Sequence, residues 1–192
     1  MRKKPVPPEG RRLLGMLRGG DRRSIGRANE VAALVQEDPP LINSLIGGLE
    51  NADPLIRMRA ADALEKATVT HPERLSPYKK QLLRIAAAAS QQEVRWHMAQ
   101  ILPRLSLTST ERGKAVRLLM KYRDDASSIV RTFALQALVE LSAGNEQLRR
   151  KVVGLLRSAL RTGTPAMRSR ARKLLDRAGA EQSGASRLRS LL

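Results

Sequence analysis

The chain carries one nine-residue pattern several times, and this repetition constrains its fold more than any other feature. Each copy begins with an apolar residue and an arginine, and further apolar residues follow three, four, six and seven positions after the arginine. Four copies align without gaps and a degenerate fifth precedes them, and the five cover residues 26–34, 56–64, 94–102, 130–138 and 167–175. Their arginines are Arg27, Arg57, Arg95, Arg131 and Arg168, which lie 30, 38, 36 and 37 residues apart. A period of this length is typical of an array of helical hairpins.

The spacing of the apolar residues within each copy is that of one face of an α-helix. Second apolar-periodic stretches lie between the copies, at residues 41–49, 77–89, 114–122 and 148–160, so each repeat is predicted to contain two helices. Four predicted helix starts place a capping oxygen directly before a proline, at Asp38, Asp53, Ser76 and Thr164. Residues 90–93 (Ser-Gln-Gln-Glu) predict a capping box, and Pro103 predicts a kink or an end late in its helix.

The pattern apolar-Arg-x-x-Ala-Ala-x-Ala-Leu, preceded by Asp or Ser and by Pro, resembles the second-helix signature of HEAT repeats. The resemblance covers residues 23–178, although Arg172 and Lys173 interrupt the last copy. It implies an all-α fold, a right-handed α-solenoid of antiparallel helical hairpins with about five repeats. It also implies a structural role for the aligned arginines, which would form a ladder with the acid of the preceding turn. Only Asp53 clearly supplies that acid, and Asp125 is a looser candidate. The ladder is therefore incomplete or uses Ser90, Ser127 and Thr164 instead.

Composition and the flanking segments complete the predicted organisation. Residues 1–22 form a basic segment rich in Pro and Gly, residues 23–178 the repeat solenoid, and residues 179–192 a short C-terminal tail. The chain has no cysteine, which excludes disulfides and thiolate chemistry. No apolar run approaches the roughly 20 residues of a membrane span. We therefore expect a soluble, cytoplasmic protein.

The sequence offers little material for catalysis, so we predict no enzymatic activity, no cofactor and no metal site. The only histidines are His71, in a predicted turn, and His97, on a predicted helix, which argues against a shared metal ion. Asp62 and Glu65 share a helix face, but such a pair is more simply explained as solvated charges. A family of DNA glycosylases that remove alkylated bases is similar in architecture and charge. Those enzymes rely on several Trp and Tyr residues around a catalytic carboxylate, whereas this chain has one Trp.

In HEAT stacks the second helices line the concave surface, so the variable positions of the pattern are candidate groove residues. The candidates for contact with a partner are Arg59, Trp96, His97, Gln100, Phe133, Gln136, Arg170 and Lys173. Four of them occupy the second position after the arginine and form a row of cations around an aromatic centre. Such a row could grip an extended peptide or stack a nucleic-acid base. Alternatively, Trp96 and Phe133 fill gaps between repeats.

The charge of the chain points to an acidic partner. The formal net charge is +18, and residues 145–192 alone hold twelve basic and three acidic residues. A field of this sign attracts acidic protein surfaces and polyanions, although the charges could also be a solvated face. We therefore predict a non-enzymatic binding or adaptor module that engages an acidic macromolecule through its concave face and its basic C-terminal hairpin. An acidic protein surface or peptide is the favoured partner, and sequence-nonspecific binding of nucleic acid is the alternative.

Overall fold

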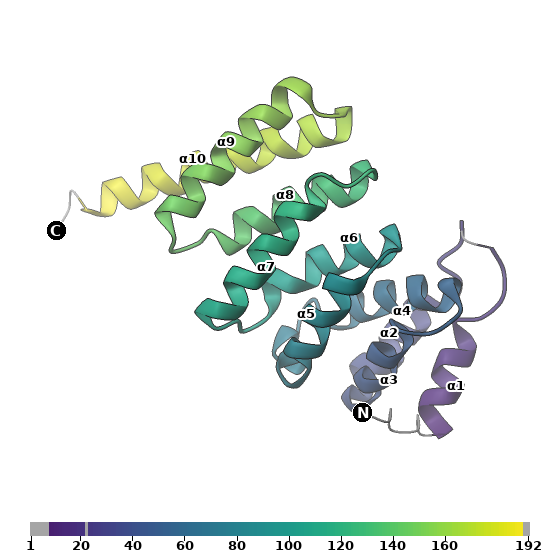
Figure 1. Ribbon diagram of the computed structural model, residues 1–192. Coiled ribbons are helices and arrows are strands. Elements are labelled where there is room, and N and C mark those ends of the chain that lie inside the picture. Colours follow the sequence, from purple (N-terminus) through teal and green to yellow (C-terminus); the bar gives the residue numbers. More distant parts are fainter. Residues whose placement is uncertain (1–7, 22, 190–192) are drawn as a thin grey trace. The chain divides into compact units, whose positions relative to one another are not determined.

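The computed structural model describes residues 8–21 and 23–189, and within these ranges the chain is all-α, with ten α-helices, three 3-10 helices and no β-strand (Figure 1). The α-helices are α1 (Pro8–Met16), α2 (Ala28–Glu37), α3 (Ile42–Gly48), α4 (Pro54–Ala67), α5 (Lys79–Ala88), α6 (Gln92–Ile101), α7 (Ser109–Tyr122), α8 (Ser128–Leu141), α9 (Glu146–Thr162) and α10 (Pro165–Arg189). The 3-10 helices are η1 (Pro39–Leu41), η2 (Pro72–Tyr78) and η3 (Leu102–Arg104). None of the described helices is long and apolar enough to span a membrane.

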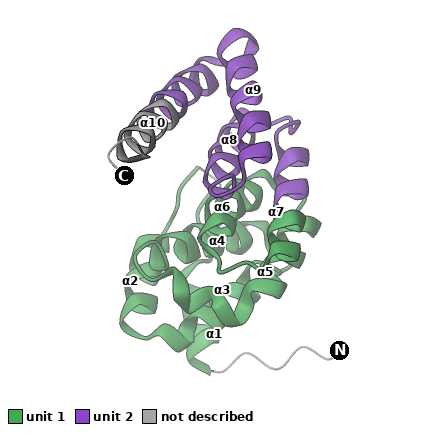
Figure 2. Cartoon of the chain, turned by 90° about the vertical axis from the view of Figure 1, so that its left-hand side faces the viewer, with its two compact units in different colours: residues 1–115 green, residues 116–192 purple. Residues whose placement is uncertain are grey.

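The chain divides into two compact units, residues 1–115 and 116–192, with the boundary inside α7 (Figure 2). In the first unit α2 packs against α4 and α4 against α6, while α1 packs on α3, α3 on α4 and α5 on α6. In the second unit α10 packs against both α8 and α9, and α8 also contacts α9. Within each unit, therefore, the helices that carry the repeated pattern pack on one another.

The apolar stripe of the pattern is the buried face of its helices. The five stripe residues of α8 are each 2% exposed or less, and they are Val130, Ala134, Leu135, Ala137 and Leu138. The equivalent residues of α4 and α6 are buried to the same degree. In α10, Met167, Ala171 and Leu174 are buried, whereas Arg172, which interrupts the pattern, is exposed. The helix face predicted from periodicity is therefore confirmed for α4, α6 and α8, and for three of the five stripe positions of α10, where Leu175 is half-buried.

The degenerate N-terminal copy follows a different register from the one predicted. α2 begins at Ala28 and buries Ala28, Val31, Ala32 and Val35, so its stripe is shifted by one residue relative to a count from Arg27. Arg27 is exposed and pairs with Glu30 of its own helix, with 2.7 Å between Nε and Oε2. The alignment of Arg27 with the other arginines is therefore wrong.

Three of the other four aligned arginines fold back onto the turn before their own helix. Each donates to a backbone carbonyl five or six residues earlier, and the bonds are Arg57 Nη1 to Asn51 O (2.7 Å) and Ala52 O (2.9 Å), Arg95 Nε to Ala89 O (2.8 Å) and Arg168 Nη1 to Gly163 O (2.8 Å). These bonds satisfy carbonyls at the turn and fix the angle at which the chain enters each helix. The arginine side chains thus have the structural role that the pattern implied.

The acid expected to complete the ladder has another role. The Asp53 carboxylate caps its own helix, α4, by accepting from the Leu55 amide at 2.8 Å. The bridge between neighbouring repeats runs through Gln91 instead. Its Oε1 accepts from Arg57 Nε at 3.1 Å, and its Nε2 donates to Pro54 O at 2.9 Å. The rung is therefore a neutral amide that can accept and donate at once.

Of the four α-helix starts predicted at a proline, two are observed. α4 and α10 begin at the predicted prolines, whereas Pro39 opens η1 and Pro77 lies inside η2. The capping box predicted at residues 90–93 is wrong, because Gln91 precedes α6 without a capping bond from its side chain. A reciprocal box joins Thr108 and Glu111 at the start of α7 instead. α6 ends at Ile101 and η3 follows, as Pro103 predicted.

Both segments outside the predicted repeats contain helix. In the N-terminal segment, α1 packs on α3 and buries Leu13, Leu14 and Leu17. Gly48 permits this close approach, because a Cβ there would lie 2.8 Å from Leu14 Cδ2. In the predicted C-terminal tail, α10 continues through Arg189, since Ala, Glu, Gln and Arg favour helix despite the two glycines. Residues 1–7, 22 and 190–192 lie outside the described residues.

Candidate partner-binding cleft

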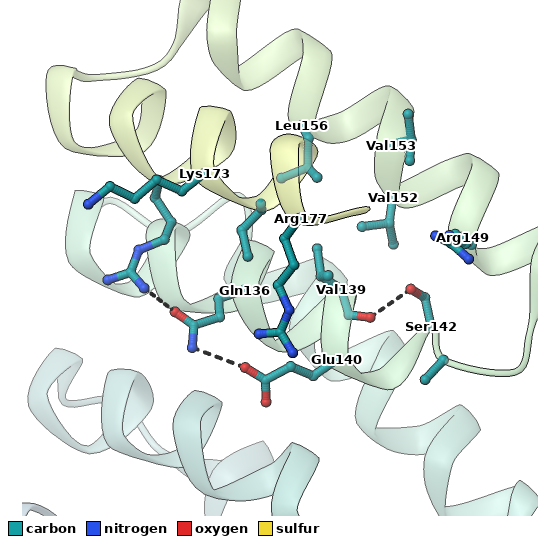
Figure 3. Close-up of a pocket in the computed structure, with 13 residues that line it drawn as sticks. Gln136, Val139, Glu140, Ser142, Arg149, Val152, Val153, Leu156, Lys173 and Arg177 are labelled. Atoms are coloured by element: carbon teal, nitrogen blue, oxygen red, sulfur yellow. Dashed lines mark hydrogen bonds between the residues drawn. The ribbon is translucent and has the colours of Figure 1, made fainter. Parts of the chain in front are cut away.

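A cationic cleft of about 460 Å³ opens among α8, α9 and α10 of the second unit (Figure 3). It is lined by Gln136, Val139, Glu140, Ser142, Ala143, Arg149, Val152, Val153, Leu156, Arg170, Lys173, Leu174 and Arg177. Four of these side chains are cations and one is an acid. Five are Val or Leu, which give the cleft an apolar floor. We call this set the cationic cleft.

Arg170 is held in place from two sides in the cationic cleft. Its Nη1 donates to Gln136 Oε1 at 2.6 Å, and its guanidinium carbon lies 5.7 Å from the centre of the Phe133 ring. Gln136 in turn donates from Nε2 to Glu140 Oε1 at 3.0 Å. A planar guanidinium has five N–H donors, and the stacked ring together with one hydrogen bond fixes its plane. The remaining edge of the guanidinium is therefore oriented before any ligand arrives.

The other charges of the cationic cleft come from two helices. Lys173 and Arg177 follow Arg170 at intervals of three and four residues, so the three lie along one side of α10. Arg149 comes from the first turns of α9, where Val152 and Leu156 provide floor residues that are each 1% exposed. The cleft thus combines positive charge at its rim with apolar side chains at its base.

The structure brings together four of the predicted contact residues: Phe133, Gln136, Arg170 and Lys173. The predicted pairing of a cation with an aromatic side chain is present, because Arg170 lies over Phe133. The basic C-terminal hairpin, whose first helix carries Arg149, was predicted to engage the partner. The apolar contribution of α9 was missed, because only the second helix of each repeat was expected to line the groove. The basic run at residues 149–151, followed directly by Val152 and Val153, is the sequence signal that could have revealed it.

Arg59 does not lie on an open face as the predicted row required. It is 1% exposed, and its guanidinium donates to four carbonyls of the loop at residues 17–24: Leu17 O (2.9 Å), Gly19 O (2.6 Å), Asp21 O (3.1 Å) and Ser24 O (3.1 and 3.2 Å). Gly26 makes room for it, because a Cβ there would lie 2.7 Å from the guanidinium carbon. The Leu17 carbonyl is buried and needs a donor, and the loop has no regular structure to supply one. Arg59 is therefore a structural clamp for that loop.

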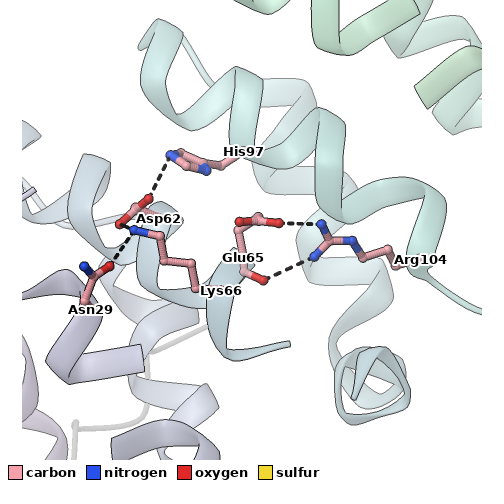
Figure 4. A network of polar contacts seen from close by, with 6 residues as sticks. All are labelled: Asn29, Asp62, Glu65, Lys66, His97 and Arg104. Atoms are coloured by element: carbon pink, nitrogen blue, oxygen red, sulfur yellow. Dashed lines mark hydrogen bonds and ion pairs between the residues drawn. The ribbon is translucent and has the colours of Figure 1, made fainter. Parts of the chain in front are cut away.

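His97 is also buried, at 7% exposed, and belongs to a polar network in the first unit (Figure 4). Its Nε2 lies 3.8 Å from Asp62 Oδ1, and Asp62 Oδ2 pairs with Lys66 Nζ at 2.7 Å. Lys66 reaches on to Asn29 Oδ1 at 2.7 Å, so the network joins α2, α4 and α6. Burial lowers the pKa of His97 to about 4, against the attraction of Asp62. The expectation that His97 is exposed is wrong.

The carboxylates that share one face of α4 do not interact with each other. Asp62 is 8% exposed and pairs with Lys66, while Glu65 pairs with Arg104, whose Nη1 also donates to Glu65 O at 3.2 Å. They are therefore ion-paired residues of the packed interior rather than solvated charges. Each carboxylate holds a cation contributed by α4 or by η3.

The two remaining predicted contact residues lie on α6. Trp96 is half-buried, with its ring centre 5.4 Å from that of His97 at a tilt of 54°, and Gln100 is half-buried as well. Trp96 therefore packs beside the network of the first unit and keeps part of its ring accessible. Across the described residues, no group of three or more His, Cys, Asp or Glu side chains gathers in a way that could hold a metal ion.

Comparison with known proteins adds no relative. No protein-family model matches the chain, and no curated protein matches it.

Proposed function

We propose that this chain is a non-enzymatic HEAT-type α-solenoid that binds an acidic segment of a partner protein in the cationic cleft. The single observation that carries the proposal is the cleft itself: four cations stand around an apolar floor in about 460 Å³. Positive charge would select acidic ligands, and the floor would select ligands that also carry an apolar side chain.

The repeat architecture in this proposal has support within each unit. Pattern-bearing helices pack in succession as α2, α4 and α6, and α10 packs on α8. Their buried stripes occupy the same positions of the pattern, and Arg57, Arg95 and Arg168 bind the turns that precede their helices. Stacked repeats in which each contacts its neighbours are the organising feature of solenoids.

A peptide suits the cleft better than a nucleic acid. Nucleic acids are held without sequence preference by cations that follow the phosphates and by exposed aromatic rings that stack the bases. Here Arg170 lies over one face of the aromatic ring beside the cleft, and the floor consists of aliphatic residues such as Val152 and Leu156. An aliphatic floor of this kind accepts a Leu, Met or Phe side chain, while Arg170 and Lys173 pair with flanking carboxylates.

Nucleic acid is the second candidate partner, because residues 145–192 carry a large positive net charge. Arg150, Lys151, Arg157 and Arg161 are exposed on α9 and do not line the cleft. A polyanion could be held by these cations at any position along the surface. The two candidates therefore differ in whether binding depends on the cleft residues or on total charge.

Fluorescence anisotropy with two labelled probes separates the candidates. One probe is a peptide of alternating Glu and Leu blocks, and the other is a single-stranded oligonucleotide of equal length. The double variant Arg170→Glu with Lys173→Glu should weaken peptide binding at least tenfold, or about 1.4 kcal/mol. The matched control, Arg157→Glu with Arg172→Glu, makes the same charge change at exposed positions of α9 and α10 outside the cleft and should weaken peptide binding less than twofold.

Other results would contradict peptide binding in the cationic cleft. Equal weakening by both double variants would mean that total charge, not the cleft, drives binding. For the oligonucleotide, the logarithm of affinity should then fall linearly with the logarithm of salt concentration, with a slope of about 0.7 per phosphate contacted. Val153→Asn tests the floor, since it should weaken the peptide but leave oligonucleotide binding unchanged.

A further inference from the structure

One aligned arginine departs from the behaviour of the others. Arg57, Arg95 and Arg168 donate to carbonyls of the preceding turn, whereas Arg131 makes no such bond among the described residues. Its Nε is buried and has no hydrogen-bond partner. A buried N–H donor without an acceptor is costly, so such a group marks a place that favours a ligand able to accept.

The repeat register shows which contact Arg131 lacks. Arg57 Nε donates to Gln91, which stands four residues before the next aligned arginine. The residue four before Arg168 is Thr164, which occupies the corresponding position for Arg131. Thr164 is too short to replace the Gln amide, and its Oγ1 accepts from the Met167 amide at 3.4 Å. Arg95 also lacks a Gln rung, because its corresponding residue is Ser127, but its Nε donates to Ala89 O instead. Arg131 therefore has neither contact in the part of the chain that the structure describes.

Arg131 lines a cavity of about 420 Å³ that shares no residue with the cationic cleft. Three hydroxyl residues, Ser158, Thr162 and Thr164, line the same cavity around the turn from α9 to α10. Thr162 donates to Ser158 O at 3.2 Å, while Thr164 accepts through its oxygen and so keeps its own hydrogen to donate. Hydrogen-bond donors from α8 and from the turn between α9 and α10 therefore line the same cavity.

The negative groups around this cavity have donors of their own. Asp124, which lines the cavity, is held by Arg123 with contacts of 2.9 and 2.7 Å. Two carbonyls of this turn are also occupied: Ala159 O accepts from the Gly163 amide at 2.9 Å, and Gly163 O accepts from Arg168. The positive charge of the Arg131 guanidinium is therefore not offset by these groups, and its Nε–H has no acceptor.

We propose that the Arg131 cavity binds a phosphate group, on the Arg131 guanidinium and the hydroxyl of Thr164. A guanidinium donates two parallel bonds to a phosphate, and a tetrahedral oxyanion still has oxygens left for hydroxyl donors that approach from other directions. Free phosphate and the phosphoryl group of a modified partner side chain share this chemistry. The site is independent of the cationic cleft and of the acidic segment proposed to bind there.

The test follows the Nε–H signals of the full chain labelled with ¹⁵N in arginine. The signal lost in Arg131→Lys is assigned to Arg131, and the one lost in Arg57→Lys is the internal control, since Arg57 Nε already donates to Gln91. Inorganic phosphate, added at constant ionic strength against chloride, should shift the Arg131 signal to saturation and leave the Arg57 signal in place. No saturable shift, or an equal shift of both signals, would overturn the proposal.

Thr164→Gln gives a second and independent test, because it supplies the missing rung while retaining Arg131. The new amide should accept from Arg131 Nε as Gln91 does from Arg57, so phosphate affinity should fall at least tenfold while the urea midpoint stays equal or rises. Undiminished phosphate affinity in Thr164→Gln contradicts the site.

A peptide carrying one phosphoserine, compared with its unphosphorylated form, distinguishes the two sources of the phosphate. Binding at least tenfold tighter than that of inorganic phosphate supports the site and assigns a modified partner. Equal affinity for the phosphopeptide and for inorganic phosphate supports the site and assigns the free ion.

Discussion

Protonation of His97 should destabilise the fold as the pH falls below about 6.5. His97 is 7% exposed, and burial lowers its pKa from 6.5 to about 4 in the folded chain. Asp62, Glu65 and Glu93 favour the protonated form and Lys66 opposes it, but loss of solvent outweighs them. The neutral imidazole is therefore the form that fits the interior.

The sign and size of the effect follow from proton linkage. Above pH 6.5 His97 is neutral in both the folded and the unfolded chain, so its protonation equilibrium has no effect on stability there. Between pH 6.5 and 4 the unfolded chain binds a proton that the folded chain does not. The free energy of unfolding should fall by about 2 kcal/mol from pH 7 to pH 5, and by about 3 kcal/mol in total at pH 4 and below.

Urea denaturation followed by the emission of Trp96, the only tryptophan, measures this loss. His97→Gln removes the titrating group and should abolish most of the difference between pH 7 and pH 5. His71→Gln is the matched control, because His71 is an exposed histidine beside Glu73 and the variant should retain the wild-type loss. The chosen window lies above the range in which Glu111 titrates, since its bond to Lys79 lowers its pKa to about 2. If His97→Gln loses as much stability as wild type, the argument from burial is refuted.

Three further predictions concern the stability of the fold and are measured by the same urea denaturation at pH 7. Leu138→Ala removes a side chain that is 0% exposed and should cost about 2 to 5 kcal/mol, whereas Ile129→Ala, at an exposed position of the same helix, should cost less than about 0.5 kcal/mol. Arg59→Met should cost about 3 kcal/mol or more, because it removes the donor of the buried Leu17 carbonyl and the other bonds that hold the 17–24 loop, and wild-type stability in this variant would contradict the clamp. Asp53→Ala should cost about 1 kcal/mol through loss of the α4 cap, and Asp53→Asn, which can still accept from the Leu55 amide, should restore most of it.

The helices and their buried faces could be predicted from the sequence because both depend on local periodicity. The stripe that contains Leu138 repeats in α4, α6 and α10, and each copy supports the interpretation of the others. The same reasoning failed for α2, where the arginine used for alignment lies one residue away from the true register. A single polar landmark is therefore weaker evidence than the apolar stripe beside it.

Residues that depend on distant partners could not be predicted from the pattern alone. The pattern placed Arg59 and His97 at variable positions, but their burial comes from a loop 35 to 42 residues earlier and from a network that joins three helices. The floor of the cationic cleft escaped prediction for a related reason. Val152 and Leu156 belong to a first helix of a repeat, and only packing of α9 against α8 and α10 turns its apolar side toward the cleft.

The clamp formed by Arg59 has a consequence for the order in which the chain can fold during synthesis. The carbonyls of residues 17–24 are translated first, and the side chain that binds them follows up to 42 residues later. At about 5 to 20 residues per second, the loop waits roughly 2 to 8 seconds for its donor. During that interval the bonds from Arg59 to the loop carbonyls cannot form. The loop that follows α1 can therefore take its final structure only after α4 has left the ribosome. The first helix to be synthesised is not the first to reach its stable packing.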